Sequence, residues 1–126
     1  MKVLVIDDDP DVAEVISLCF EKRWPQTMVV SAADGTEGLT LIERENPDVV
    51  ILDVGLPEMN GFEVCNRLRH ISSVPVIMLT ARGADADVSC GLEVGADDYI
   101  SKPFSYVQLM SRVQAVLRRA RGSRVP

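Results

Sequence analysis

Five polar residues of this chain, each close behind a short apolar run, are of the types that phosphoryl transfer requires. They are Asp7, Asp8, Asp53, Thr80 and Lys102, and the runs before them read VLVI, DVVIL, VPVIML and DDYIS. The carboxyl ends of parallel strands meet in one crevice, so we expect these side chains to lie together. Three acids, a hydroxyl and an ammonium are the groups needed to hold a divalent cation and a phosphoryl group.

The acids of this set favour a hard cation. Carboxylates about 4 Å apart repel each other by roughly 4 kcal/mol per pair at an effective dielectric constant near 20. A cation held by Asp7, Asp8 and Asp53 would relieve that repulsion. Oxygen ligands without His or Cys indicate Mg²⁺, with Mn²⁺ as a substitute, rather than Zn²⁺. The neighbouring Asp9 stands directly before Pro10, and we interpret it as a helix N-cap instead.

Composition indicates one soluble globular domain in the cytoplasm. The chain has 126 residues, of which 47% are apolar and 25% charged. No apolar stretch approaches the roughly 20 residues of a membrane span, and no signal-peptide pattern follows Met1. The three cysteines, at positions 19, 65 and 90, have no metal-binding spacing and are interpreted as reduced thiols. The net charge of −6 argues against direct nucleic-acid binding.

Strand and helix patterns alternate along the chain. Strands are expected at residues 2–6, 27–31, 48–52, 74–79 and 97–101. Helices are expected from Asp9-Pro10 to just before Pro25, from Asp34-Gly35 to Asn46-Pro47, around 62–68, roughly at 84–94, and from near Ser105. This alternation predicts an α/β fold of the (βα)5 type, a doubly wound parallel sheet with flavodoxin-like strand order 2-1-3-4-5. Residues 1–120 would form one domain, and 121–126 the start of a linker or tail.

Several longer segments resemble one protein family. The chain is similar to the CheY-like receiver domains of bacterial two-component response regulators, most of all to the OmpR/PhoB-like subfamily. The similarity is carried by VLVIDDD (3–9), DVVILDVGLPEMNGFEV (48–64), VIMLTA (76–81), GLEVGADDYISKPF (91–104) and LRR (117–119).

The resemblance assigns roles to the candidate site. It implies that Asp53 accepts a phosphoryl group from a phosphohistidine of a sensor histidine kinase. It implies that Asp8 binds Mg²⁺ directly, that Asp7 helps through water, and that Asp53 and the backbone carbonyl of Gly55 complete the protein ligands. Thr80 and Lys102 would contact the phosphate, Tyr99 would be the aromatic switch, and the Lys102–Pro103 peptide would be cis.

The resemblance also implies an output. Such receivers precede a DNA-binding domain, which this chain does not include, and form phosphorylation-dependent homodimers through the helix at 84–94, the strand at 97–101 and the last helix. In this chain Val88 and Gln108 stand where the family has one interfacial ion pair. Asp98 and Arg112 retain another pair, and Asp97 with Arg118 or Arg119 would add contacts.

Two other classes fit parts of the pattern. An aspartyl-phosphate phosphatase of the haloacid-dehalogenase type also uses Asp, Thr, Lys and Mg²⁺. Its nucleophile lies in a DxDx[TV] motif after the first strand, but here Asp11 occupies the position of Thr or Val. A flavodoxin-type flavin-binding module needs a Ser/Thr/Gly-rich loop after that strand, where this chain has three acids.

His70, the only histidine, is interpreted as a solvated residue at the end of a helix.

Overall fold

The computed structural model describes residues 1–81 and 94–122, and the elements of this part alternate between strand and helix. The strands are β1 (Lys2–Ile6), β2 (Met28–Ala32), β3 (Val49–Asp53), β4 (Val76–Thr80) and β5 (Asp98–Ser101). The helices are α1 (Pro10–Arg23), α2 (Gly35–Glu45), α3 (Gly61–Leu68) and α5 (Tyr106–Gly122).

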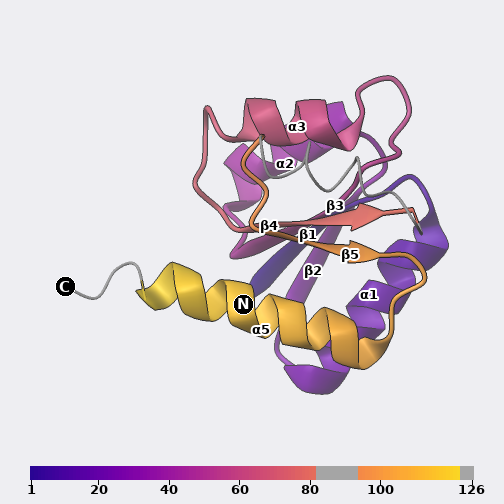
Figure 1. The fold of residues 1–126 in the computed structure, drawn as a ribbon, viewed down its shortest axis with the longest axis vertical. Helices are drawn as coiled ribbons and strands as arrows, with labels where there is room; N and C mark the ends of the chain where they lie inside the picture. The colour runs from indigo at the N-terminus through magenta and orange to yellow at the C-terminus, as the bar shows by residue number, and fades with distance from the viewer. Residues whose placement is uncertain (82–93, 123–126) are drawn as a thin grey trace.

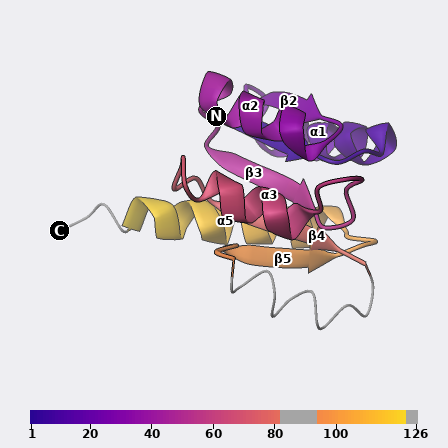
Figure 2. The ribbon, with the colours of Figure 1, turned by 90° about the horizontal axis from the view of Figure 1, so that it is seen from above.

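The five strands form one parallel sheet in the predicted order β2-β1-β3-β4-β5. The order reverses between β1 and β3, so the loops after these two strands leave the sheet side by side. All strands point the same way, and the last turns of α5 lie toward the opposite end of the sheet (Figure 2). The predicted fold class is therefore confirmed.

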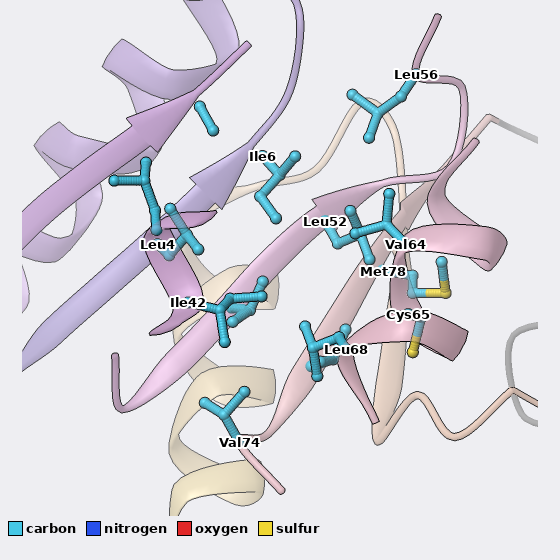
Figure 3. Close-up of a cluster of buried hydrophobic side chains, with 14 residues drawn as sticks. Leu4, Ile6, Ile42, Leu52, Leu56, Val64, Cys65, Leu68, Val74 and Met78 are labelled. Carbon is cyan, nitrogen blue, oxygen red and sulfur yellow. The ribbon is translucent and has the colours of Figure 1, made fainter. Parts of the chain in front are cut away.

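Two layers of helices enclose the sheet. Helices α2 and α3 cover one face and α1 and α5 the other (Figure 1). Side chains alternate along each strand, so that β1 contributes Leu4 and Ile6 to the core under α2 and α3, and Val3 and Val5 to the core under α1 and α5. Figure 3 shows the first of these cores. Because both faces are covered, β3 and β4 are buried throughout, which accounts for their continuous apolar sequences.

Helix ends follow their local sequence signals. Asp9, Asp34 and Asn60 are N-caps whose side chains accept hydrogen bonds from backbone amides of the first turn. Asn46 closes α2 in a left-handed conformation with φ of 47°, one of the few that Asn adopts readily. The interpretation of Asp9 as a cap is confirmed.

Some predicted boundaries were wrong by one or two residues. Strands β2, β3 and β4 each end one residue later than predicted, so that Asp53 and Thr80 are the last residues of strands instead of the first residues of loops. The last helix extends to Gly122, and the domain end expected at residue 120 stays a prediction. The helix expected at 84–94, including Val88, falls almost wholly on residues 82–93, outside the described residues.

Within the described part of the chain, no helix is both long and apolar enough to cross a membrane.

Candidate functional site

Three carboxylates gather at the carboxyl ends of β1 and β3. One oxygen from each of Asp7, Asp8 and Asp53 lies within 4.8 Å of the others. Asp7 and Asp53 are buried, with 4% and 8% of their surface exposed, whereas Asp8 is open to solvent. The structure therefore brings together the three predicted acids at the point where the strand order reverses.

Lys102 places a positive charge between two of these acids. Its Nζ lies 3.1 Å from Oδ2 of Asp7 and 3.3 Å from Oδ1 of Asp53. The residue follows the end of β5, and its backbone N–H donates to the carbonyl of Thr80 at 2.8 Å, which extends the pairing of β4 with β5. The Lys102–Pro103 peptide is cis, the conformation that the resemblance implies.

The titration of these groups reflects their burial and their mutual contacts. Burial raises the pKa of Asp7 above its usual value, and the nearby charge of Asp53 adds to the rise. The backbone N–H of Asp9 and the ammonium of Lys102 oppose it only partly. Burial lowers the pKa of Lys102, but the hydrogen bond to Asp7 and the charge of Asp53 raise it by more. Lys102 is therefore protonated at neutral pH, whereas keeping the buried Asp7 carboxylate ionised costs the folded protein free energy.

The donor set fits a hard divalent cation. The three carboxylates carry three formal negative charges, and Lys102 carries one positive charge. A net charge of −2 therefore remains in a partly buried space. All the available ligand atoms are oxygens, which Mg²⁺ and Mn²⁺ prefer. Asp8 is exposed and accepts no hydrogen bond from any described residue, so its oxygens are free for a ligand.

Hydrogen bonds from backbone N–H groups hold the loop after β3 close to Asp53. The N–H of Gly55 donates to Oδ1 of Asp53 at 3.3 Å, and the N–H of Gly61 donates to the carbonyl of Val54 at 2.9 Å. A Cβ on Gly61 would collide with the carbonyl of Asp53 and lie 2.8 Å from Cα of Val54, so a side chain has no room there. By contrast, the nearest atom to a Cβ on Gly55 would be Oδ2 of Asp53 at 4.0 Å.

Thr80 and Tyr99 lie on one face of the sheet. Thr80 ends β4, and strand alternation puts it on the same side as Met78, which packs under α2 and α3. Tyr99 is the register partner of Met78 and packs against the same core. Only 2% of Thr80 is exposed, and its hydroxyl makes no hydrogen bond with the described residues.

The residues expected on a dimer face separate into different environments. Asp98 is paired within the chain, to Nη1 of Arg112 at 3.1 Å and to Nη2 of Arg119 at 3.9 Å. Asp97 is held by Arg69 at 2.8 Å. Arg118 lies apart from both acids and lines a hollow beside the end of α1.

Two structural residues were missed from the sequence. The guanidinium of Arg69 donates to the carbonyl of Gly95 at 2.8 and 3.0 Å, to the carbonyl of Val74 at 2.6 Å, and to Asp97. Gln108 accepts from the N–H of Ser105 at 2.9 Å while its own N–H donates to the hydroxyl of Ser105 at 3.1 Å. This is a capping box, and its Ser-x-x-Gln signal was readable in the sequence.

Comparison with known sequences gives a consistent picture. A family model described as "Response regulator receiver domain" matches residues 3–114. The DNA-binding response regulator MtrA of Mycolicibacterium smegmatis is 47% identical over 118 residues, which are 94% of this chain and 51% of that protein. The probable transcriptional regulator ycf27 of Guillardia theta is 48% identical over 120 residues, 94% of this chain and 46% of that protein. The chain thus spans about half the length of these relatives.

Solved structures match over nearly the whole chain. The BeF3-activated N-terminal receiver domain of RstA from Klebsiella pneumoniae has a TM-score of 0.86 and 34% identity, covering 94% of this chain and 99% of that one. A CheY-like receiver domain protein from Methanospirillum hungatei has a TM-score of 0.89 and 27% identity, covering 97% of each chain.

Proposed function

This chain belongs to the response regulator receiver domain family, and from that premise we propose that Asp53 is its phosphoacceptor. A receiver domain is a phosphorylation switch and not a classical enzyme. One observation carries the assignment: the ammonium of Lys102 lies 3.3 Å from Asp53 and 3.1 Å from Asp7, in a crevice that Asp8 shares. Membership of this family also sets aside the phosphatase and flavin-binding alternatives.

The proposed donor is a phosphohistidine of a sensor histidine kinase. An oxygen of Asp53 forms a bond to phosphorus while the bond from phosphorus to the imidazole nitrogen breaks, and the departing imidazole keeps that electron pair. Asp7, Asp8, Asp53 and the carbonyl of Gly55 would hold Mg²⁺, or Mn²⁺ in its place. The ion, when bound, supplies charge neutralisation for the transferring oxygens. Lys102 adds a second positive charge, so catalysis is mainly positioning and electrostatics.

Thr80 and Tyr99 are the proposed switch. The hydroxyl of Thr80, which makes no hydrogen bond with the described residues, would donate to a phosphoryl oxygen on Asp53, and Tyr99 would turn toward the space that Thr80 leaves. Their common face on β4 and β5 supports this coupling. The signal would then reach the surface formed by β5, α5 and the segment expected to be helical at 84–94.

An apolar groove beside the crevice supports a protein as phosphodonor. It has a volume of about 530 Å³ and lies between α1 and the loop after β5, lined by Val12, Val15, Pro103 and Phe104 next to Lys102. Half of Val15 is exposed to solvent. We therefore place the helix of the kinase that carries the histidine in this groove.

The groove is tested by comparing two phosphodonors. Val15→Asp should slow transfer from a histidine kinase that phosphorylates the wild type, because it puts a charge in an apolar contact. It should leave labelling by acetyl phosphate unchanged, since a small donor does not use the groove. Equal slowing with both donors would contradict the placement.

The output is proposed from the longer relatives. MtrA is described as a DNA-binding response regulator, and residues 121–126 would begin the linker from a receiver of residues 1–120 to such an effector domain. The described surface would itself bind no nucleic acid.

A phosphorylation-dependent homodimer through Asp97, Asp98, Arg112 and Arg118 is part of this proposal. We assign the protein to the cytoplasm and not to a membrane.

Intact-mass spectrometry tests the proposed chemistry. With acetyl phosphate and Mg²⁺, the wild type should gain one phosphoryl group that is lost in base. Asp53→Asn should gain none, because the nucleophile is absent. Omission of Mg²⁺ should abolish labelling of the wild type. Equal labelling of both proteins would exclude Asp53.

A further inference from the structure

The short strand β5 carries Lys102 to the site, but its own side chains specify its register only weakly. In the described part of the chain β5 is the outermost strand on its side of the sheet and pairs only with β4 (Figure 2). Of its four residues only Ile100 is buried, and register depends mainly on a buried apolar face. A slip of one residue would move Lys102 by about 3.3 Å and turn its side chain to the other face of the sheet.

Asp97, directly before β5, binds both backbone groups of Val76, the first residue of β4. Its N–H donates to the carbonyl of Val76 at 2.9 Å, and its Oδ2 accepts from the N–H of Val76 at 2.8 Å. These two bonds place Asp97 opposite one particular residue of β4. The register set there continues along the ladder to its last bond, from the N–H of Lys102 to the carbonyl of Thr80 at 2.8 Å.

Arg69, at the end of α3, holds that carboxylate in place. Its Nη2 donates to the same Oδ2 of Asp97 at 2.8 Å and to the carbonyl of Gly95 at 2.8 Å. Its Nε also donates to Gly95 at 3.0 Å, and its Nη1 donates to the carbonyl of Val74 at 2.6 Å. Gly95 has a φ of 97°, which favours glycine. One guanidinium therefore ties the segment that leads into β4 to the segment that leads into β5.

We propose that Arg69 and Asp97 are positioning residues for phosphoryl transfer and act through Lys102. They fix the register of β5 at one end of the strand, and the strand carries that register to the ammonium at its other end. Among the described residues, neither makes an ion pair with Lys102 or with the acids that Lys102 contacts. The inference rests on the proposed role of Lys102 beside Asp53. An Arg69 that only stabilised the fold would lower Tm without changing what Lys102 contributes to the reaction.

A double-mutant cycle on the rate of labelling tests this role. The initial rate with acetyl phosphate and Mg²⁺ is measured by intact-mass spectrometry, at a temperature at which every variant is folded. Arg69→Gln should slow labelling about tenfold, because a misplacement of about 1 Å can cost on the order of 100-fold in rate. In a Lys102→Gln background the same substitution should change the rate less than about twofold. Arg67→Gln is the matched control on the same helix, where Arg67 pairs with Glu63, and it should react like the wild type.

Two variants of Asp97 provide a second, independent measurement. Asp97→Ala removes the acceptor for Val76 and should slow labelling only while Lys102 is present. Asp97→Asn keeps an acceptor oxygen and should restore most of the rate.

The possible failures point to different claims. Equal slowing by Arg69→Gln with and without Lys102, or wild-type rates in both Arg69→Gln and Asp97→Ala, would overturn the positioning role alone. Lys102→Gln labelled as fast as the wild type, or a wild type that is not labelled, would contradict the proposed function and this inference with it.

Discussion

At the scale of single residues, the site is an arrangement of charges that is incomplete without a cation. Asp7 and Asp53 are buried beside each other, and Lys102 is the one ammonium within 4 Å of them in the described part of the chain. Asp8 completes the cluster from the solvent side. Each of these side chains is placed by the end of a strand, so the geometry depends on the sheet rather than on the loops.

The first prediction concerns the charge of Asp7. Its pKa in the folded protein is raised, chiefly by burial, so its contribution to stability is fully present below its ordinary pKa and is lost as pH rises through the folded value. Asp7→Asn should therefore raise the Tm of the metal-free protein at pH 7, and this advantage should shrink as the pH falls toward 4. Calorimetry across this range measures it. A variant less stable than the wild type at pH 7 would contradict the role given to burial.

The second prediction separates the two exposed acids of the same loop. Asp8 belongs to the cluster, whereas Asp9 accepts from the N–H of Asp11 at 2.9 Å as the cap of α1. Asp8→Ala should weaken Mg²⁺ binding by about tenfold or more, which corresponds to about 1.4 kcal/mol. Asp9→Ala should leave Mg²⁺ binding nearly unchanged and cost about 1 kcal/mol of stability. Mg²⁺ titration and urea unfolding of both variants decide it, and the reverse ranking would show that the register of the loop is misassigned.

At the scale of elements, the start of β5 is fastened to α3 and β4. Arg69 at the end of α3 reaches the carbonyls of Gly95 and Val74 and the carboxylate of Asp97. That carboxylate also accepts from the N–H of Val76, the first residue of β4. Since β5 carries Tyr99 and leads to Lys102, this contact fixes the base of the strand whose other end forms the site.

The third prediction tests this attachment. Arg69→Lys should destabilise the protein by about 2 kcal/mol, because a single ammonium cannot satisfy both carbonyls and the carboxylate. Arg67→Lys is the matched control on the same helix: Arg67 makes an exposed i,i+4 pair with Glu63 at 2.9 Å, which contributes only about 0.2–0.5 kcal/mol. Urea unfolding gives both values. Similar losses in the two variants would mean that the Arg69 contacts are not stabilising.

Predictability from sequence also differs between elements. Helix ends were predictable where one residue determines them, as at Asp9, Asp34 and Asn46. The ends of β3 and β4 were placed one residue early, because pairing with a neighbouring strand continues past the apolar run. The N–H of Val54, for example, still donates to the carbonyl of Leu79. The Arg69 contact had no local signal, since its partners include two backbone carbonyls, and the carbonyl of Gly95 and the carboxylate of Asp97 are distant in the sequence.

The same contrast holds for the candidate site. The convergence of Asp7, Asp8, Asp53 and Lys102 followed from strand ends alone, because parallel topology brings such ends together. The different surroundings of Arg118 and Arg119 could not be predicted in this way, because they depend on which side of α5 packs against α1. The capping role of Gln108 could have been read from Ser105-x-x-Gln.

At the scale of the whole molecule, the proposed signal moves from the crevice to the surface of β5 and α5. One acid of this surface, the partly buried Asp98, is already paired with Arg112 inside one chain. Asp97 is engaged by Arg69. Dimer contacts through these residues must therefore be shared with, or exchanged for, contacts that the single chain already makes.

The fourth prediction concerns this self-association. Beryllofluoride with Mg²⁺, as a phosphoryl analogue, should strengthen dimerisation of the wild type, and Arg112→Ala should weaken the activated dimer by about 1 kcal/mol or more. The lost contact would be the pair with Asp98, and Arg67→Ala, on an exposed part of α3, serves as the control. Sedimentation velocity over a concentration series measures both. A wild type that stays monomeric when activated, or an Arg112→Ala dimer of equal strength, would assign the signal to another surface.

The central claim is that Asp53 carries the phosphoryl group, and mapping the modified residue tests it most directly. The protein labelled with acetyl phosphate and Mg²⁺ is treated with borohydride, which reduces an aspartyl phosphate to homoserine, and is then digested and sequenced by mass spectrometry. Homoserine should appear at position 53 and should be absent from the metal-free control. Homoserine at position 7 or 8, or phosphate retained on His70, would contradict the account.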